Sequence, residues 1–455
     1  MLTTKKIFRL MNICITAAVF AGCGNGKGVP TTNPAIQAFT AIPSIVSPGQ
    51  STTLTSDFSG GTGRLDNGVV TRITFGNIST FKAAATTLFT LSVTNKLGQK
   101  VSKSVLLTLS PIQGKFSSSI SKTVDPRDNY TATFLDPNIV SGPNAGKALL
   151  VGGGTGVALH YRSSAELYDP LHDTFARTGF KAYSTALHAA TLLNNGKVLI
   201  TGGWDGRQSH NDGQLYDPAT GSFAFTGAMA RARSSHTSTL LPDGTVLITG
   251  GYDGAVSLAS AELYNPVTGT FTFTNGPMAV ARSGHAATLL NNGKVLISGG
   301  TPDNTLCEIY DPGTKTFRST GRMIYARSFH TATLLSSDPV AKVLVAGGST
   351  NTIAELYDPI TETFAATDPM TTVRTYHTAT LLPDKRVLLT GGSDESAEFY
   401  DPNTRTFAET LRDMKEARGS HQAILLHNVP NKYNLPDMVL VVGGTGFINR
   451  ADLFR

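Results

Sequence analysis

The sequence predicts an all-β protein whose main part, residues 114–455, is a ring of seven four-stranded sheets, a β-propeller. A glycine doublet ends an apolar strand seven times, at intervals of 44 to 52 residues, which is the repeat length of a propeller blade. Short runs of Val, Leu, Ile, Thr and Tyr have the composition of β-strands. Pairs such as Asn195-Gly196 separate these runs, as two-residue hairpin turns do. The doublets begin at Gly152, Gly202, Gly250, Gly299, Gly347, Gly391 and Gly443.

Each unit contains four strand-like segments. In the fifth unit they are residues 330–335, 342–348, 354–359 and a segment that begins at Thr363. Strands joined by short turns pair with their neighbours in sequence, so each unit is expected to be an antiparallel meander.

The order of motifs within a unit resembles the kelch repeat, in the variant common in bacterial surface proteins. In the fifth unit the glycine doublet is followed by Glu-Leu-Tyr-Asp-Pro (355–359), then Thr-Phe (363–364), then Arg-x-x-His (374–377). The resemblance covers all seven units and implies a kelch-type propeller. Phe stands where kelch repeats usually have Trp, and it fills the same apolar position without an indole N–H to satisfy. These residues are Phe116, Phe175, Phe223, Phe271, Phe317, Phe364 and Phe407.

The two ends of the propeller are expected to share its last blade. The seventh unit stops at Arg455, directly after its third strand. A matching fourth strand, residues 115–119, precedes the first unit. Pairing of the two segments would close the ring and remove an open sheet edge.

Residues 1–22 have the features of a lipoprotein signal peptide. Three basic residues precede an apolar stretch that is too short to span a bilayer but has the length of a secretory h-region. Residues 20–23 (Phe-Ala-Gly-Cys) resemble a bacterial lipobox with Phe where Leu is usual, so Cys23 would carry a lipid and begin the mature chain. Gly24 fits the pattern that goes with export to the outer membrane in enteric bacteria. We therefore expect a lipid-anchored protein of the cell envelope, in the outer membrane of a Gram-negative bacterium; the alternative is an ordinary cleaved signal with an incidental cysteine.

Two further segments lie between Cys23 and the propeller. Residues 23–34, rich in Gly, Asn, Thr and Pro, are expected to form a flexible tether. Within residues 35–111, the motifs at 48–55 (Pro-Gly-Gln-Ser-Thr-Thr-Leu-Thr) and 89–98 (Phe-Thr-Leu-Ser-Val-Thr-Asn-Lys-Leu-Gly) resemble strands of a small bacterial immunoglobulin-like β-sandwich. No Trp follows the first motif, as a departure from that family. The resemblance implies a spacer domain.

Cysteine content argues against an intramolecular disulfide in the mature chain, and the charge argues against nucleic-acid binding. If Cys14 leaves with the signal and Cys23 carries a lipid, Cys307 has no partner for an intramolecular disulfide. The formal net charge is +6, and half of it lies on the signal peptide. This modest charge and the expected export argue against nucleic acid as a partner.

A histidine recurs near the start of the first strand in six units, and Tyr130 takes its place in the first unit. A metal site needs three or four ligand atoms within about 2.1 Å of one ion. Equivalent atoms around a seven-fold ring lie too far apart for that, so we interpret the histidines as structural hydrogen-bonding groups and predict no metal or cofactor. They are His188, His236, His285, His330, His377 and His421.

An arginine lies three residues before this position in six units, and an acid lies in the third strand of six units. The arginines either face an anionic ligand or pair with the acids. The second unit favours pairing, because it alone has Thr185 in place of the arginine and Gln214 in place of the acid. Leaving one partner of a buried pair alone costs about 3–5 kcal/mol, which accounts for their joint loss. The arginines are Arg127, Arg233, Arg282, Arg327, Arg374 and Arg418, and the acids are Glu166, Glu262, Glu308, Glu355, Glu398 and Asp452.

The loops between strands 2 and 3 and between strands 4 and 1 share one face of the propeller, which we call the 2–3/4–1 face. The chain enters on the opposite side, so this face is expected to be free to bind. Its loops carry the only Trp of the chain beside Asp, Arg and His, and aromatic rings stack on ligands while polar neighbours hydrogen-bond. Alternatively, residues 205–206 and 253–254 are ordinary turns and Trp204 packs between loops. The candidate binding residues are Trp204, Asp205, Arg207, His210, Asp212, Tyr252, Asp253, His160 and Arg162.

Three classes of function fit this organisation. The favoured one is a non-enzymatic, surface-tethered recognition or scaffold protein that binds a protein or a glycan, because no nucleophile–base pair, phosphate loop or metal spacing stands out. The second is a kelch enzyme acting on carbohydrate, similar to galactose oxidase or a sugar mutarotase. Galactose oxidase uses a crosslinked Cys–Tyr pair and histidine ligands for copper, whereas Cys307 lies in a repeat strand. The third is a purely structural component of the envelope. No catalytic residue is assigned.

Overall fold

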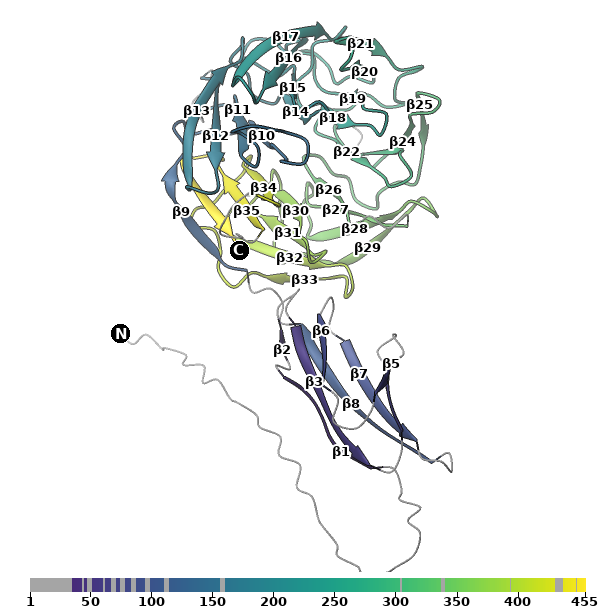
Figure 1. Ribbon diagram of the computed structural model, residues 1–455. Coiled ribbons are helices and arrows are strands. Elements are labelled where there is room, and N and C mark those ends of the chain that lie inside the picture. Colours follow the sequence, from purple (N-terminus) through teal and green to yellow (C-terminus); the bar gives the residue numbers. More distant parts are fainter. Residues whose placement is uncertain are drawn as a thin grey trace, which may run out of the picture. The chain divides into compact units, whose positions relative to one another are not determined.

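β-Strands form the regular secondary structure of the described part of the chain (Figure 1). The computed structural model describes residues 35–42, 45–46, 51–59, 62–66, 71–73, 78–82, 87–94, 99–109, 114–155, 160–302, 305–336, 340–392, 394–429, 437–446 and 448–455. The predicted signal peptide (1–22), the tether (23–34) and with it Cys23 lie outside these residues. Within them, no helix has the length and apolar character needed to cross a membrane. The chain divides into two units, Met1–Pro111 and Ile112–Arg455.

The first unit contains two β-sheets. One has the strand order β1-β3-β6 and the other β2-β8-β7-β4-β5, and β2 pairs with β8 in parallel while the other pairs are antiparallel. In β7 the buried Leu91 and Val93 alternate with partly exposed Ser92 and Thr94, which is the pattern of a sheet with one covered face. The strands are β1 (Ala35–Ile42), β2 (Ile45–Val46), β3 (Ser51–Ser59), β4 (Thr62–Asp66), β5 (Thr71–Ile73), β6 (Ile78–Lys82), β7 (Thr87–Thr94) and β8 (Lys100–Leu109).

The second unit is a seven-bladed β-propeller. Each blade is a four-stranded antiparallel meander, and the colours of Figure 1 run around the ring from blue to yellow. Blades one to three are β10 (Thr131–Phe134), β11 (Ala148–Val151), β12 (Ser164–Asp169) and β13 (Thr174–Phe180); β14 (Ala189–Leu192), β15 (Val198–Thr201), β16 (Asp212–Asp217) and β17 (Ser222–Ala228); and β18 (Thr237–Leu240), β19 (Val246–Thr249), β20 (Ala261–Asn265) and β21 (Thr270–Phe273).

The remaining blades follow the same plan. Blades four to six are β22 (Ala286–Leu289), β23 (Val295–Ser298), β24 (Cys307–Asp311) and β25 (Thr316–Ser319); β26 (Thr331–Leu334), β27 (Val343–Ala346), β28 (Ile353–Asp358) and β29 (Thr363–Pro369); and β30 (Thr378–Leu381), β31 (Val387–Thr390), β32 (Ala397–Asp401) and β33 (Thr406–Glu409). Blade seven is β34 (Gln422–Leu426), β35 (Met438–Val442), β36 (Arg450–Phe454) and β9 (Phe116–Lys122).

Burial changes across each blade in a regular way. The second strand is buried along its whole length, whereas the fourth strand is largely exposed apart from its Phe. In blades one to six this Phe packs on the buried Tyr of the third strand, with ring centroids 4.7 to 5.0 Å apart. In blade seven Phe116 packs on Phe454 in the same way, at 5.1 Å. Phe therefore fills the same apolar position against the third strand in all seven blades.

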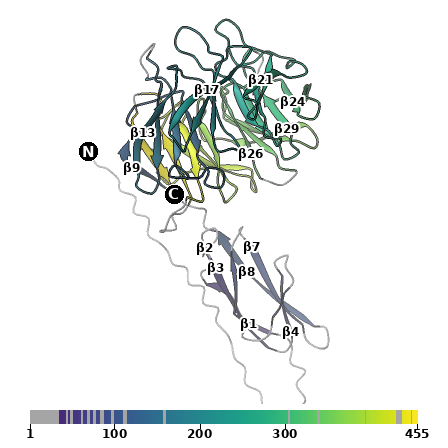
Figure 2. The ribbon, with the colours of Figure 1, turned by 45° about the horizontal axis from the view of Figure 1, so that its top comes forward.

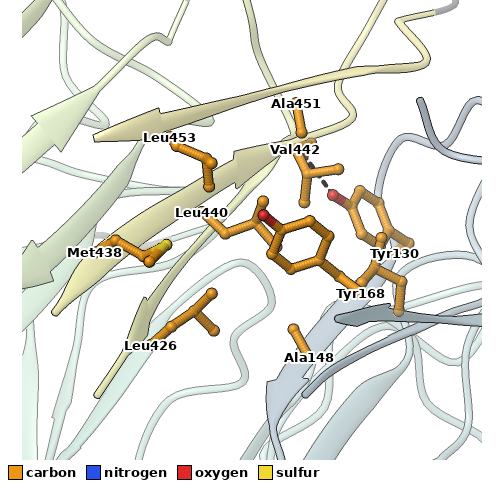
Figure 3. Close-up of a cluster of buried hydrophobic side chains, with 10 residues drawn as sticks. Tyr130, Ala148, Tyr168, Leu426, Met438, Leu440, Val442, Ala451 and Leu453 are labelled. Carbon is orange, nitrogen blue, oxygen red and sulfur yellow. Dashed lines mark hydrogen bonds between the residues drawn. The ribbon is translucent and has the colours of Figure 1, made fainter. Parts of the chain in front are cut away.

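The ring closes through blade seven, as predicted from the sequence. Strand β9 pairs antiparallel with β36, so one N-terminal and three C-terminal strands complete the sheet. Figures 1 and 2 both place β9 beside β13 at the outside of the ring. A buried cluster joins blades seven and one, and in it the hydroxyl of Tyr130 donates to the carbonyl oxygen of Val442 (Figure 3).

A circle of backbone hydrogen bonds surrounds the centre of the propeller. One residue per blade, directly before the repeated histidine or Tyr130, has a φ between 48° and 60°. Its N–H donates to the carbonyl oxygen of the equivalent residue in the preceding blade, at 2.8 to 3.4 Å, and the seven bonds form a closed cycle. We call these residues the mouth ring. They are Asn129, Leu187, Ser235, Gly284, Phe329, Tyr376 and Ser420.

Candidate functional site

Six arginines form buried ion pairs with the acid of the third strand in the same blade. The N···O distances are 2.6 to 3.0 Å, and the arginine side chains are at most 1% exposed. Each arginine also donates to the carbonyl oxygen of the first glycine of the doublet, at 2.6 to 2.8 Å. The predicted pairing is confirmed, and these charges belong to the scaffold. The pairs are Arg127–Glu166, Arg233–Glu262, Arg282–Glu308, Arg327–Glu355, Arg374–Glu398 and Arg418–Asp452.

The six repeated histidines link neighbouring blades. The Nε2 atom of each lies 2.8 to 3.0 Å from a Thr or Ser hydroxyl of the preceding blade. Burial lowers the pKa of His236, His330, His377 and His421 to about 3, and it lowers the pKa of His188 and His285 well below the ordinary value. In the described structure their Nδ1 atoms are buried without a partner, so a second proton would have no acceptor. The predicted hydrogen-bonding role is confirmed, and the imidazoles are neutral.

Blade two replaces the arginine pair with other polar groups. Lys181 occupies the position that is a buried Met in blades three to seven (Met229, Met278, Met323, Met370 and Met414). Its Nζ donates to the carbonyl oxygen of Thr185 at 3.3 Å and to the Thr185 hydroxyl. Burial lowers the pKa of Lys181 to about 7, against the attraction of Asp212. Gln214 takes the place of the acid, and its Oε1 accepts the N–H of Ala182 at 2.8 Å.

The 2–3 loop of blade two is organised by Asp205. Its Oδ1 accepts the N–H groups of Arg207 and Gln208 at 2.8 and 2.9 Å, and its Oδ2 lies 2.8 Å from Nε2 of His210. Burial alone would raise the pKa of Asp205, but the hydrogen bonds from Gln208, His210 and Arg207 outweigh it and lower the pKa to about 2. Asp205 thus shapes the turn and holds His210, while the side chain of Arg207 is exposed.

His210 lies between two carboxylates and beneath an aromatic ring. Its Nδ1 is 3.7 Å from Oδ1 of Asp212, an oxygen that is buried without a hydrogen-bond partner in the described structure. Tyr183 of the 4–1 loop stacks on the His210 ring with centroids 4.6 Å apart, and Phe225 follows at 6.1 Å from Tyr183. Tyr183 and Phe225 are exposed, so blade two carries an aromatic strip beside the hydrogen-bonded Asp205 and His210.

Trp204 is partly buried between the loops of blades two and three. Its backbone bridges to Ala186 and Ser209, and a β-carbon added at Gly254 would lie 3.6 Å from Cζ3 of the indole. In the blade-three loop, Asp253 Oδ1 accepts the N–H groups of Ala255 and Val256, both at 2.9 Å. Asp205 and Asp253 are therefore turn-forming residues, and the indole packs beside the neighbouring loop.

The remaining candidates differ in their surroundings. Tyr252 is 37% exposed on the blade-three loop. In blade one His160 is exposed, whereas Arg162 forms an ion pair with Asp125 at 3.2 Å. Among the described residues, no hydrogen bond or ion pair joins His160 or Arg162 to the blade-two loop. The structure thus brings Asp205, His210 and Asp212 together and puts the indole of Trp204 beside Gly254 of blade three. Among the described residues, the blade-one pair shares none of these contacts.

A cavity of about 320 Å³ opens at the centre of the same face. It is lined by the mouth ring and, below it, by the six neutral histidines and Tyr130. The side chains of the mouth ring differ from blade to blade, from Gly284 to Tyr376, although the backbone repeats. Sequence analysis missed this feature, yet a signal was present, because this position varies while the histidine that follows it and the arginine two residues before it recur.

The part of the chain that the structure describes does not bring three His, Cys, Asp or Glu side chains together as metal ligands. Cys307 is buried in β24, and burial raises the pKa of its thiol to about 12. Its sulfur lies 3.7 Å from the carbonyl oxygen of Thr305. Cys307 thus lies inside the sheet of blade four.

A family model described as "Kelch motif" matches residues 187–229 and 233–277, which contain all four strands of blades two and three. The same four-stranded unit recurs in all seven blades. The second unit is a seven-bladed kelch propeller. No curated protein matches the chain.

Among solved structures, the kelch propeller is similar to "Novel fungal alcohol oxidase with catalytic diversity among the AA5 family, in complex with copper". The match has a TM-score of 0.59 and 16% sequence identity, and it covers 75% of this chain and 76% of the oxidase chain. At this identity the likeness shows a shared fold and leaves the activity of this chain open.

Proposed function

We propose that this kelch propeller is a non-enzymatic recognition or scaffold protein that binds a protein or a glycan through its 2–3/4–1 face. The observation that supports the proposal is the contrast in burial between the repeated polar side chains and the aromatic side chains of this face. The repeated arginines, acids and histidines are bonded inside the scaffold, whereas three tyrosines of this face stay exposed: Tyr183, Tyr252 and Tyr376 are 43%, 37% and 42% exposed.

Aromatic side chains at this face suit recognition because Tyr and Trp are enriched at binding hot spots and present large rigid surfaces. Trp204 lies among them with the exposed Arg207, which supplies hydrogen-bond donors to a ligand. Asp205 and Asp253 support this surface by fixing the loops.

In this proposal the propeller is held at the cell surface. Cys23 carries the lipid, residues 23–34 form the tether, and the first unit is an immunoglobulin-like sandwich that acts as a spacer. Metabolic labelling with a palmitate analogue tests the anchor: the wild type should take up the label and Cys23→Ala should not. Equal labelling of both proteins would overturn the anchor and leave face recognition untouched.

The binding role is tested by thermal unfolding of the purified protein with monosaccharides, glycan fragments, Ca²⁺ and Cu²⁺, and by cross-linking on intact cells. A ligand at about 100 times its dissociation constant adds roughly 2.7 kcal/mol to the free energy of unfolding, which raises the melting temperature visibly. We expect either such a rise with a sugar or glycan fragment or a cross-linked protein partner, and either should weaken in Trp204→Ala. A rise with Ca²⁺ or Cu²⁺ alone would indicate a metal site and would not support the proposal. The absence of both a rise in melting temperature and a cross-linked partner would contradict the proposal.

A further inference from the structure

The mouth ring places three bulky side chains on a strained backbone. Leu187, Phe329 and Tyr376 have φ values of 56°, 52° and 57°, a region that L-residues with large side chains rarely adopt. The same position holds Gly284 and Asn129 in other blades, so the fold accepts residues that suit a positive φ. The repeat requires the positive φ but does not require a bulky side chain at this position. Backbone strain that is kept beside a cavity suggests a function for the side chains that cause it.

Two of these side chains form an aromatic platform at the cavity. The rings of Phe329 and Tyr376 stack with centroids 4.5 Å apart and an interplanar angle of 28°. Phe329 in turn lies over Gly284, where a β-carbon would come within 2.8 Å of the Phe329 ring. Gly284 therefore leaves the room that the platform needs. Tyr376 at its end stays 42% exposed, as the surface that a ligand meets.

The cavity beside this platform is uncharged. None of its lining residues, all of which are described, is Asp, Glu, Lys or Arg. The histidines beneath are neutral, since they are buried and already bonded to hydroxyls. Polar side chains of the lining include the hydroxyls of Ser235 and Ser420 and the amide of Asn129. Such groups both donate and accept hydrogen bonds without favouring either sign of charge.

We propose that the channel mouth binds a neutral pyranose ring of a glycan, with the apolar face of the sugar on Tyr376 and its hydroxyls toward Asn129, Ser235 and Ser420. The cavity volume of about 320 Å³ lies at the lower end of the range of roughly 300–1,000 Å³ typical of small-ligand sites. A peptide brings charged termini or side chains as well as rings, and this lining offers no charge to pair with them. The inference rests on the proposed function, because it names the ligand class and the seat of binding on the same face.

The test is saturation-transfer NMR on the purified full-length protein with methyl glycosides of glucose, galactose and mannose, followed by calorimetric titration of the one that binds. We expect at least one to bind, and the methyl glucuronide, which differs by a carboxylate, to bind more weakly. Tyr376→Ala should weaken binding by about tenfold or more, which corresponds to about 1.4 kcal/mol. Tyr376→Phe, which keeps the ring, should retain most of the affinity.

Two further variants separate binding from folding. Ser235→Lys crowds the cavity without touching the platform and should also weaken binding. Phe273→Ala removes an exposed ring from the outer strand β21 and should leave the affinity unchanged. Melting temperatures of all variants identify any that fail to fold.

The outcomes distinguish this inference from the proposed function. If glycosides bind and Trp204→Ala abolishes binding while Tyr376→Ala does not, the face is a recognition surface but the mouth is not the seat. If only a capped phenylalanine peptide binds, in a Tyr376-dependent way, the occupant is a protein side chain and the sugar assignment is wrong. If no glycoside binds but a cross-linked partner exists in cells, the sugar inference fails alone; if there is no partner either, both fail.

Discussion

The backbone N–H of Asn129 donates to the carbonyl oxygen of Ser420 across 3.1 Å. This bond joins blade one to blade seven and completes the cycle of the mouth ring. At the outside of the propeller, β9 completes the sheet of blade seven with β36. The ring is thus closed twice, once at the channel by backbone hydrogen bonds and once at the rim by strand pairing.

Removal of residues 450–455 should open the propeller. The deletion takes away β36, leaves β9 without its partner, and uncovers the buried face formed with Leu453 and Phe454. We expect a lower melting temperature and a broader transition by calorimetry, because blades one and seven no longer support each other. Removal of Arg455 alone keeps β36 and should have little effect. A truncated chain that melts as cooperatively as the full chain would show that closure does not depend on this strand.

The repeat explains what the sequence predicts well. Strand order recurs in every unit and the arginine–acid pair in six, so each weak pattern is supported by its repetition. The joint absence of Arg and Glu at Thr185 and Gln214 identifies the pairing. Closure follows because the fourth strand that the seventh unit lacks precedes the first unit. Features that occur once are harder to predict. The repeat shows that Lys181 stands four residues before Thr185, where five other units have Met before Arg. That its amine extends toward Thr185 depends on side-chain packing and is seen only in the structure.

The mouth ring shows a second limit of sequence reasoning. Asn129 and Gly284 tolerate a left-handed backbone, but Phe329 and Tyr376 do not favour it, and tertiary hydrogen bonds impose it on them. The loops carrying Trp204 and Asp205 were placed on the correct face by topology. The roles of Asp205 and Asp253 in forming the turns became clear only from their bonds to backbone N–H groups.

The pair Arg327–Glu355 should show strong coupling in a double-mutant cycle. Both side chains are fully buried, 2.9 Å apart, and removal of either leaves an unpaired buried charge, which costs about 3–5 kcal/mol. The double variant Arg327→Ala/Glu355→Ala should be little less stable than either single variant. Chemical denaturation measures the three free energies of unfolding.

A surface pair provides the control for this cycle. Arg318 of blade four and Glu362 of blade five form an ion pair whose side chains are 49% and 33% exposed. Exposed pairs contribute about 0–1 kcal/mol, so the same cycle at Arg318 and Glu362 should be nearly additive. Additivity at Arg327 and Glu355 would show that they do not act as a buried pair.

Lys181→Met should stabilise the protein most at low pH. Burial lowers the folded pKa of Lys181 to about 7 from an ordinary value of 10.5. Between these values the unfolded chain holds a proton that the folded chain lacks, so the free energy of unfolding of the wild type gains up to about 1.4 kcal/mol per pH unit as pH rises. The cost of the buried charge is fully present below pH 7. The advantage of Lys181→Met should therefore be greatest at pH 6 and shrink towards pH 10.

Denaturation of the wild type and Lys181→Met at pH 6, 8 and 10 measures this difference. Lys415→Met, at an exposed lysine, is the matched control and should show no such change with pH. A difference between the wild type and Lys181→Met that stays constant with pH would mean that Lys181 keeps its ordinary pKa in the fold.

Leu187 offers a direct measure of strain in the mouth ring. Its φ of 56° suits glycine, and a left-handed conformation costs other L-residues roughly 1–2 kcal/mol. Leu187→Gly should therefore be more stable than Leu187→Ala by about 1 kcal/mol, because both lose the same contacts and only glycine relieves the backbone. At Leu192, inside β14, the order should reverse, since glycine within a strand costs about 0.5–1 kcal/mol relative to alanine. Urea denaturation of the four variants gives both differences. Alanine more stable than glycine at Leu187 would mean that the mouth ring carries no strain, and the inference of function from its bulky side chains would lose its basis.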